Sequence, residues 1–160
     1  MLNLVELLLE DSRIDPSKPD SSSLIIASEN GNIDIVELLL QDPRVDPDAK
    51  NGLALKLAVV NMNDEVVDLL LRDGRANPTY NGNELVYNAI EAAMRSEKYD
   101  TVKVLLEDPR IDPSRNRNYA AGIAYQHLDV RLLALLLANE NVKKTINPHT
   151  RRVYEGILGG

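Results

Sequence analysis

The sequence predicts an all-α protein, a helical solenoid of about 4.5–5 stacked helix–turn–helix repeats. Three features recur together along its 160 residues: an apolar triplet, a proline preceded by Asp or Asn, and an alanine. The triplets lie at residues 7–9, 38–40, 69–71, 104–106 and 135–137, at spacings of 31 or 35 residues. A fixed period of this length is typical of repeat proteins, whose small units bury their apolar faces by stacking on one another.

The prolines and alanines keep the register of the triplets. A proline stands seven residues after the end of each of the first four triplets, and an alanine stands eleven residues after each of these prolines. The prolines are Pro16, Pro47, Pro78 and Pro113, and the alanines are Ala27, Ala58, Ala89 and Ala124. A fifth proline, Pro148, follows its triplet after eleven residues. We expect the four alanines to be buried where neighbouring helix pairs approach closely.

Each repeat divides into two helices by its apolar spacing. In residues 33–40, Ile33, Val36 and Leu39 recur at helical spacing, and Pro43 ends the helix because proline donates no backbone hydrogen bond. The Asp–Pro pair that follows predicts a turn. After such a turn the first helix of the next repeat begins; in residues 23–30 this helix is short and leads to Gly31. We expect helices near residues 2–10, 23–30, 33–41, 54–61, 64–72, 84–96, 100–107, 119–127 and 130–138.

Two four-residue insertions interrupt the period. The insertion around residues 94–98 predicts a longer first helix, because four residues form about one helical turn. The insertion around 141–145 is interpreted as loop variation, with a binding element as the alternative. We expect a single domain over 1–160, with a half-repeat at 1–16, repeats at 17–47, 48–78, 79–113 and 114–148, and an incomplete unit at 149–160.

The composition excludes several kinds of chemistry. With no Cys and only two His, the chain has no thiolate nucleophile and little material for a metal site, so we expect no metal and no cofactor. It lacks the short motifs of phosphate-binding loops and of common hydrolases, which predicts a protein that is not an enzyme. Hydrolysis by paired carboxylates, such as Asp64 and Glu65, remains a remote alternative.

Charge and hydropathy indicate which partners to expect. The net charge is −7, with 7 basic and 15 acidic residues in 1–80 but 11 basic and 10 acidic residues in 81–160. Such a chain is a poor candidate for binding nucleic acid, which needs a broad basic face. No stretch of 18 apolar residues and no targeting segment is visible, so we expect no membrane span and an intracellular, cytoplasmic location.

Residues 27–40, Ala-Ser-Glu-Asn-Gly-Asn-Ile-Asp-Ile-Val-Glu-Leu-Leu-Leu, resemble the ankyrin repeat family nearly residue for residue. The resemblance extends over essentially the whole chain, although the family's Thr-Pro-Leu-His signature is missing and its usual period of 33 is shortened. It implies a non-catalytic module that binds another protein or peptide on the face formed by turn tips and first helices. The alternative is a structural or self-associating fragment of a longer array that uses its exposed end faces; the oligomeric state stays open.

The family's contact positions, together with neighbouring Tyr and Arg residues, supply the candidate binding residues. They are Lys18, Lys50, Tyr80, Asn83, Arg115, Arg117, Tyr119, Arg151, Arg152 and Tyr154. Tyr and Arg are enriched at binding hot spots, and the arginines favour an acidic partner. We expect the arginines after Pro113 and Pro148 to project from the same edge. For Tyr119 and Tyr154, each six residues after a repeat proline, an equivalent structural role is the alternative.

Overall fold

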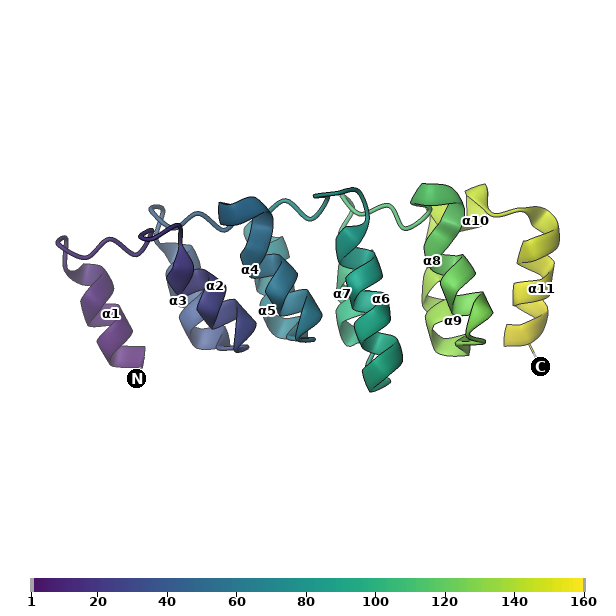
Figure 1. Cartoon of the computed structure of the whole chain (residues 1–160), viewed down its shortest axis with the longest axis horizontal. Helices are drawn as coiled ribbons and strands as arrows, with labels where there is room; N and C mark the ends of the chain where they lie inside the picture. The colour runs from purple at the N-terminus through teal and green to yellow at the C-terminus, as the bar shows by residue number, and fades with distance from the viewer. Residues whose placement is uncertain (1, 160) are drawn as a thin grey trace. The chain divides into compact units, whose positions relative to one another are not determined.

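The computed structural model describes residues 2–159, and every regular element in that range is an α-helix (Figure 1). The expected all-α helical repeat architecture is therefore confirmed. The chain forms two compact units, an N-terminal unit, Met1–Tyr80, and a C-terminal unit, Asn81–Gly160.

The N-terminal unit has two layers of helices. Its helices are α1 (Leu2–Glu10), α2 (Ser22–Glu29), α3 (Ile33–Gln41), α4 (Ala49–Val60) and α5 (Asp64–Asp73). The first helices of two repeats, α2 and α4, pack on each other, and the second helices α1 and α5 both pack on α3. Figure 1 shows α2 in front of α3 and α4 in front of α5. Each first helix also packs on its own second helix, which closes the core between the layers.

The C-terminal unit repeats this pairing and adds two helices. It contains α6 (Glu84–Ser96), α7 (Asp100–Glu107), α8 (Arg115–Gln126), α9 (Val130–Ala138), α10 (Glu140–Thr145) and α11 (Pro148–Leu158). The pairs α6–α7 and α8–α9 are complete repeats, and α6 packs on α8 as α2 packs on α4. The short helix α10 packs on both α8 and α9, and α11 packs on α9.

The nine helices expected from the apolar spacing are all present. The helices α4 and α8 begin earlier than expected, at residues 49 and 115, because each includes a left-handed segment at its start, residues 50–52 and 116–118. The regular right-handed turns begin after these segments, close to the expected starts. Helix α6 has 13 residues against 8 in α2, so the insertion around residues 94–98 lengthens the first helix as expected.

The segment after residue 138 differs from the expectation of a variable loop. The insertion around 141–145 is helix α10, which Asn139 begins by accepting hydrogen bonds from the N–H groups of Asn141 and Val142. Val142 and Ile146 are buried, so this helix adds to the core. Asn147 accepts the N–H of His149 at 2.8 Å and begins α11, whose first residue is a proline. Both helices therefore start at an asparagine cap.

The four register alanines are buried, as expected. Ala27 is 4% exposed, and Ala58, Ala89 and Ala124 are fully buried. The carbonyl oxygens of Ala27, Ala58 and Ala124 each accept the N–H five residues later at 2.9 Å, which ends the first helix and starts the next connection. A larger side chain at these positions would meet neighbouring helices, so the alanines fix how closely the repeats stack.

Candidate functional site

The turn of each repeat is fastened by the Asp or Asn that precedes the repeat proline. The N–H of Ser17 donates to Asp15 at 3.0 Å, and the N–H of Ser114 donates to Asp112 at 3.1 Å; the same bond recurs in the two repeats between them. The serine hydroxyls also donate to these carboxylates and lower the pKa of Asp15 and Asp112. The four repeat prolines up to Pro113 are buried, so the chain leaves each turn in a fixed direction.

A recurring arginine, whose role the sequence analysis missed, ties two turns of the N-terminal unit to the preceding repeat. In the N-terminal unit, Arg75 donates to the carbonyl oxygens of Leu40 at 2.6 Å and Val45 at 3.0 Å while pairing with Asp73 at 2.8 Å. Arg44 makes the corresponding bonds one repeat earlier. The signal was present, because this arginine stands three residues before every one of the first four repeat prolines.

The turn tips contain residues with left-handed backbone. Lys50 and Asn51 have φ values of 54° and 58°, and Asn116, Arg117 and Asn118 have φ values of 54°, 58° and 59°. Non-glycine residues in this region are strained, and asparagine tolerates it best. The candidate residues Lys50 and Arg117 thus lie on tight, strained tips that the surrounding hydrogen bonds hold in place.

In the N-terminal unit, the candidate residues are engaged with acidic neighbours. Lys18 is exposed, 3.9 Å from the carboxylate three residues before it. The ammonium group of Lys50 lies 3.7 Å from Asp20, across the repeat boundary. Tyr80 donates its hydroxyl to Asp48 at 2.6 Å, which raises the pKa of the tyrosine. The contacts of Lys50 with Asp20 and of Tyr80 with Asp48 therefore link the tips of successive turns.

The C-terminal unit brings three candidate residues together at the start of α8. Arg115 and Arg117 are exposed, and Tyr119 is 55% exposed. Its ring meets the edge of Tyr87 from α6, with centroids 5.3 Å apart and planes at 86°. Asn116 donates to the hydroxyl of Tyr87 at 2.9 Å and ties the tip to α6. The sequence analysis missed Tyr87, whose position nine residues after Pro78 places it on the neighbouring first helix.

The candidates on α11 have different surroundings. Arg151 pairs with Glu155 at 2.8 Å, and Arg152 is exposed. Tyr154 is only 5% exposed and packs on Tyr125 of α8 at a centroid distance of 5.0 Å. This burial raises the pKa of Tyr154. The structure therefore gives Tyr154 the core role that was its alternative, while Tyr125, 40% exposed, is a surface aromatic that the sequence analysis overlooked.

The turns at Pro113 and Pro148 are not equivalent, contrary to the expectation. Pro113 is buried and precedes a left-handed tip, whereas Pro148 is exposed and is the first residue of a regular helix. The tyrosines six residues later consequently differ in exposure. Arg117 of α8 has a left-handed backbone, whereas Arg151 and Arg152 of α11 lie within a regular helix. Asn83, another candidate, is 4% exposed and donates to the carbonyl oxygen of Asp112 at 2.7 Å, so it fastens neighbouring repeats.

Carboxylates within the described residues serve mostly structural roles. Asp108 pairs with Arg110 at 2.6 Å, which lowers the pKa of that carboxyl, and Asp64 and Glu65 occupy the first turn of α5. Over residues 2–159, no three His, Asp or Glu side chains are arranged to hold a metal ion. None of the helices described there is long and apolar enough to cross a membrane.

Comparison with known proteins places this geometry in a family. The family model described as "Ankyrin repeats (3 copies)" matches residues 1–81. No curated protein and no solved structure is similar enough to the chain to count as a match.

Proposed function

This chain belongs to the ankyrin repeat family, and we propose that it binds another protein or a peptide through its turn tips and first helices. Ankyrin repeats generally mediate protein–protein interaction and are generally non-catalytic. The proposal adds a location on this chain: the tyrosine–arginine tip, defined as Tyr87, Arg115, Arg117 and Tyr119.

One observation supports this location above the others. Two exposed arginines and an exposed tyrosine lie at one helix start, and the tyrosine is braced by a second aromatic ring. Tyr and Arg dominate binding hot spots because they offer large contact areas and directional hydrogen bonds. A side chain held in place before binding loses less conformational freedom when a partner docks. The tip therefore has both the composition and the rigidity of a contact site.

The charges of the C-terminal unit favour an acidic partner. Arg115, Arg117, Lys144 and Arg152 form no ion pair among the described residues, whereas Lys143 and Arg151 pair with glutamates. Arginine binds carboxylates through two parallel hydrogen bonds and also stacks on aromatic rings. We propose Arg151 and Arg152 as outer contacts of the same acidic partner, and Lys18, Lys50 and Tyr80 as weaker contacts on the N-terminal tips.

The test begins with capture of partners from a host extract, followed by titration of the recovered partner. The double variant Arg115→Ala with Arg117→Ala should weaken binding about tenfold or more, since two charged hydrogen-bonding groups are lost. A matched control is Arg72→Ala with Lys103→Ala, which removes two exposed cations from second helices. The proposal fails if both double variants bind the partner as tightly as the parent, or if both lose affinity equally.

A second candidate, self-association, has its own observation. Helix α1 packs on α3 and leaves Leu4, Leu7 and Leu8 exposed by 60%, 66% and 41%. We propose that a second copy can cover this apolar face. Sedimentation velocity over a range of protein concentrations should then show a dimer that Leu4→Glu with Leu7→Glu abolishes. A parent protein that sediments as a monomer throughout would rule this candidate out.

A further inference from the structure

Helix α8 carries a gap on its exposed face, at Gly122. A Cβ built at this position would have no heavy atom within 4 Å apart from its two chain neighbours and the backbone of its own helix. Packing therefore does not require a glycine, and glycine is among the least favourable residues inside a helix. The glycine leaves an open surface in the middle of a first helix, where a partner can approach the backbone closely.

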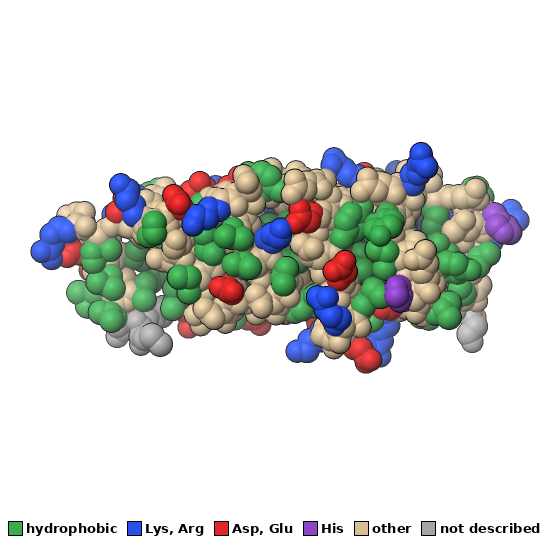
Figure 2. All heavy atoms as spheres, viewed as in Figure 1, with side chains coloured by type: hydrophobic (Ala, Val, Ile, Leu, Met, Phe, Trp, Pro, Cys, Tyr) green, Lys and Arg blue, Asp and Glu red, His purple; other side chains and the backbone are tan. Residues whose placement is uncertain are grey.

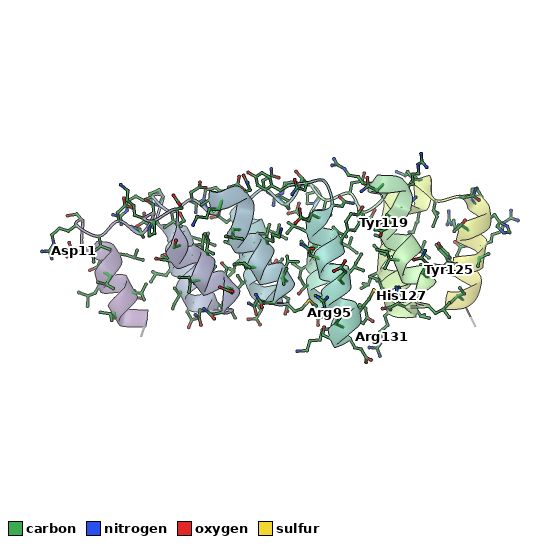
Figure 3. All side chains as sticks on the ribbon, in the orientation of Figure 1. Asp11, Arg95, Tyr119, Tyr125, His127 and Arg131 are labelled. Carbon is green, nitrogen blue, oxygen red and sulfur yellow. The ribbon has the colours of Figure 1, made fainter. Side chains whose placement is uncertain are left out.

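Two exposed tyrosines flank this gap. Tyr119 lies three residues before Gly122 and Tyr125 three residues after it, so the three share the outer side of α8. Figure 3 shows Tyr119 on the α6 side of α8 and Tyr125 on the α11 side. Over these six residues the helix advances about 9 Å, so the two tyrosines stand about one and a half turns apart with Gly122 midway between them. Ala120, Ala121 and Ala124 occupy the buried side of the same helix.

Each flanking tyrosine is held by a second ring while staying exposed. Tyr119 meets the edge of Tyr87, and Tyr125 packs on the buried Tyr154. The exposed fractions of 55% and 40% leave much of both rings available to a ligand. Aromatic walls fixed in this way offer apolar contact area at a small cost in side-chain freedom. Figure 2 shows apolar side chains gathered over the exposed face of α8.

We propose that the tyrosine-flanked gap, Tyr119, Gly122 and Tyr125, takes one apolar side chain of an acidic peptide. The inference rests on the proposed function and extends it, because it adds an apolar residue to the acidic partner. The charges indicate which ligand binds here. Arg115 and Arg117 lie at the N-terminal end of the same helix and bind carboxylates of the peptide. A cationic side chain, which tyrosine rings can also hold, is disfavoured by these two arginines.

The test uses three synthetic peptides and NMR signals of the tyrosine rings. The peptides are Glu-Glu-Phe-Glu-Glu, Glu-Glu-Ala-Glu-Glu and Lys-Lys-Phe-Lys-Lys. The phenylalanine peptide with glutamates should bind at least threefold more tightly than the alanine peptide, and should shift the ring signals of Tyr119 and Tyr125. The lysine peptide should bind most weakly. Equal affinity for the two glutamate peptides would overturn the inference.

Glycine variants separate this inference from the proposed function. Gly122→Leu should abolish the preference for phenylalanine but keep residual binding of both glutamate peptides through the arginines. The control Gly156→Leu fills a comparable open position on α11 and should bind like the parent. Gly122→Ala should raise the melting temperature by about 2–4 °C, which shows that the fold tolerates the change.

The outcomes are distinguishable. If Gly122→Leu keeps the full preference for phenylalanine, the gap is not the subsite, while the tyrosine–arginine tip stands. If Arg115→Ala with Arg117→Ala leaves the binding of both glutamate peptides unchanged, the acidic-partner proposal fails. If no peptide shifts any tyrosine signal, the subsite at the tyrosine-flanked gap and the acidic-partner proposal are both overturned.

Discussion

The arginine that ties a turn to the preceding repeat leads to a quantitative prediction at Arg75. Replacing Arg75 with alanine removes two hydrogen bonds to backbone carbonyls of the neighbouring repeat and an ion pair with Asp73. A hydrogen bond from a charged donor contributes about 1.5–3 kcal/mol when it is shielded from water. The side chain is 38% exposed, so solvent screening reduces this, and we expect Arg75→Ala to lower the free energy of unfolding by about 2–3 kcal/mol.

The same motif supplies the control. Arg13 stands at the equivalent position of the first turn, but its side chain is 88% exposed and its hydrogen bonds within the described residues all go to Asp11. An exposed local pair of this kind contributes little, so Arg13→Ala should cost less than about 0.5 kcal/mol. Arg75→Lys should also lose most of the stabilisation that Arg75 contributes, because one ammonium group cannot bridge two carbonyls and a carboxylate.

Urea denaturation followed by circular dichroism at 222 nm measures these differences. With a typical dependence on denaturant, the midpoint of Arg75→Ala should fall by about 1 M, while that of Arg13→Ala should move little. Equal shifts for the two variants would refute the reasoning, since both remove the same arginine from the same motif. The arginine would then act through its local aspartate alone.

Three further predictions follow from individual residues. Ala58→Leu should destabilise the fold by about 1–3 kcal/mol through overpacking, measured by thermal melting, and an unchanged melting temperature would contradict the assigned register. The hydrogen bond from Tyr99 to Asp129 raises the pKa of this tyrosine to about 12, so its stabilisation is present below pH 10 and is lost as pH rises towards 12. Absorbance titration should show a tyrosine that ionises near pH 12, and Tyr99→Phe should remove it. Arg117→Gly should stabilise the fold by about 0.5–1 kcal/mol in urea denaturation, by relieving left-handed strain, while weakening partner binding.

Features that depend on periodicity could be predicted from the sequence. The burial of Ala58 and its counterparts follows from the fixed distance to the repeat proline, because every repeat must present the same small side chain to its neighbour. The extra turn of α6 follows from arithmetic, since four inserted residues add about one helical turn. Helix α10 was not predicted because its polar sequence resembles a loop, although Asn139 is a recognisable helix cap.

The surroundings of single side chains could not be predicted from the same spacing. Tyr119 and Tyr154 both follow a proline by six residues, yet one is exposed and the other is in the core. The difference arises in the backbone between proline and tyrosine: three left-handed residues precede Tyr119, whereas Tyr154 is already in the second turn of a regular helix. Nothing in the register distinguishes these two paths, so the pairing of Tyr125 with Tyr154 also required the structure.

In the C-terminal unit, the residues that fix the turn before α8 differ from those that present the binding surface. The carboxylate of Asp112, the buried Pro113 and the amide of Asn83 hold the turn. The N–H of Asn118 donates to the carbonyl oxygen of Ser114 at 2.9 Å, which closes the left-handed segment of residues 116–118 on this turn. Arg117 is exposed, and its side chain takes part in none of these hydrogen bonds. Substitutions at the exposed tip can therefore change the partner without unfolding the repeat, whereas substitutions beneath it change stability first.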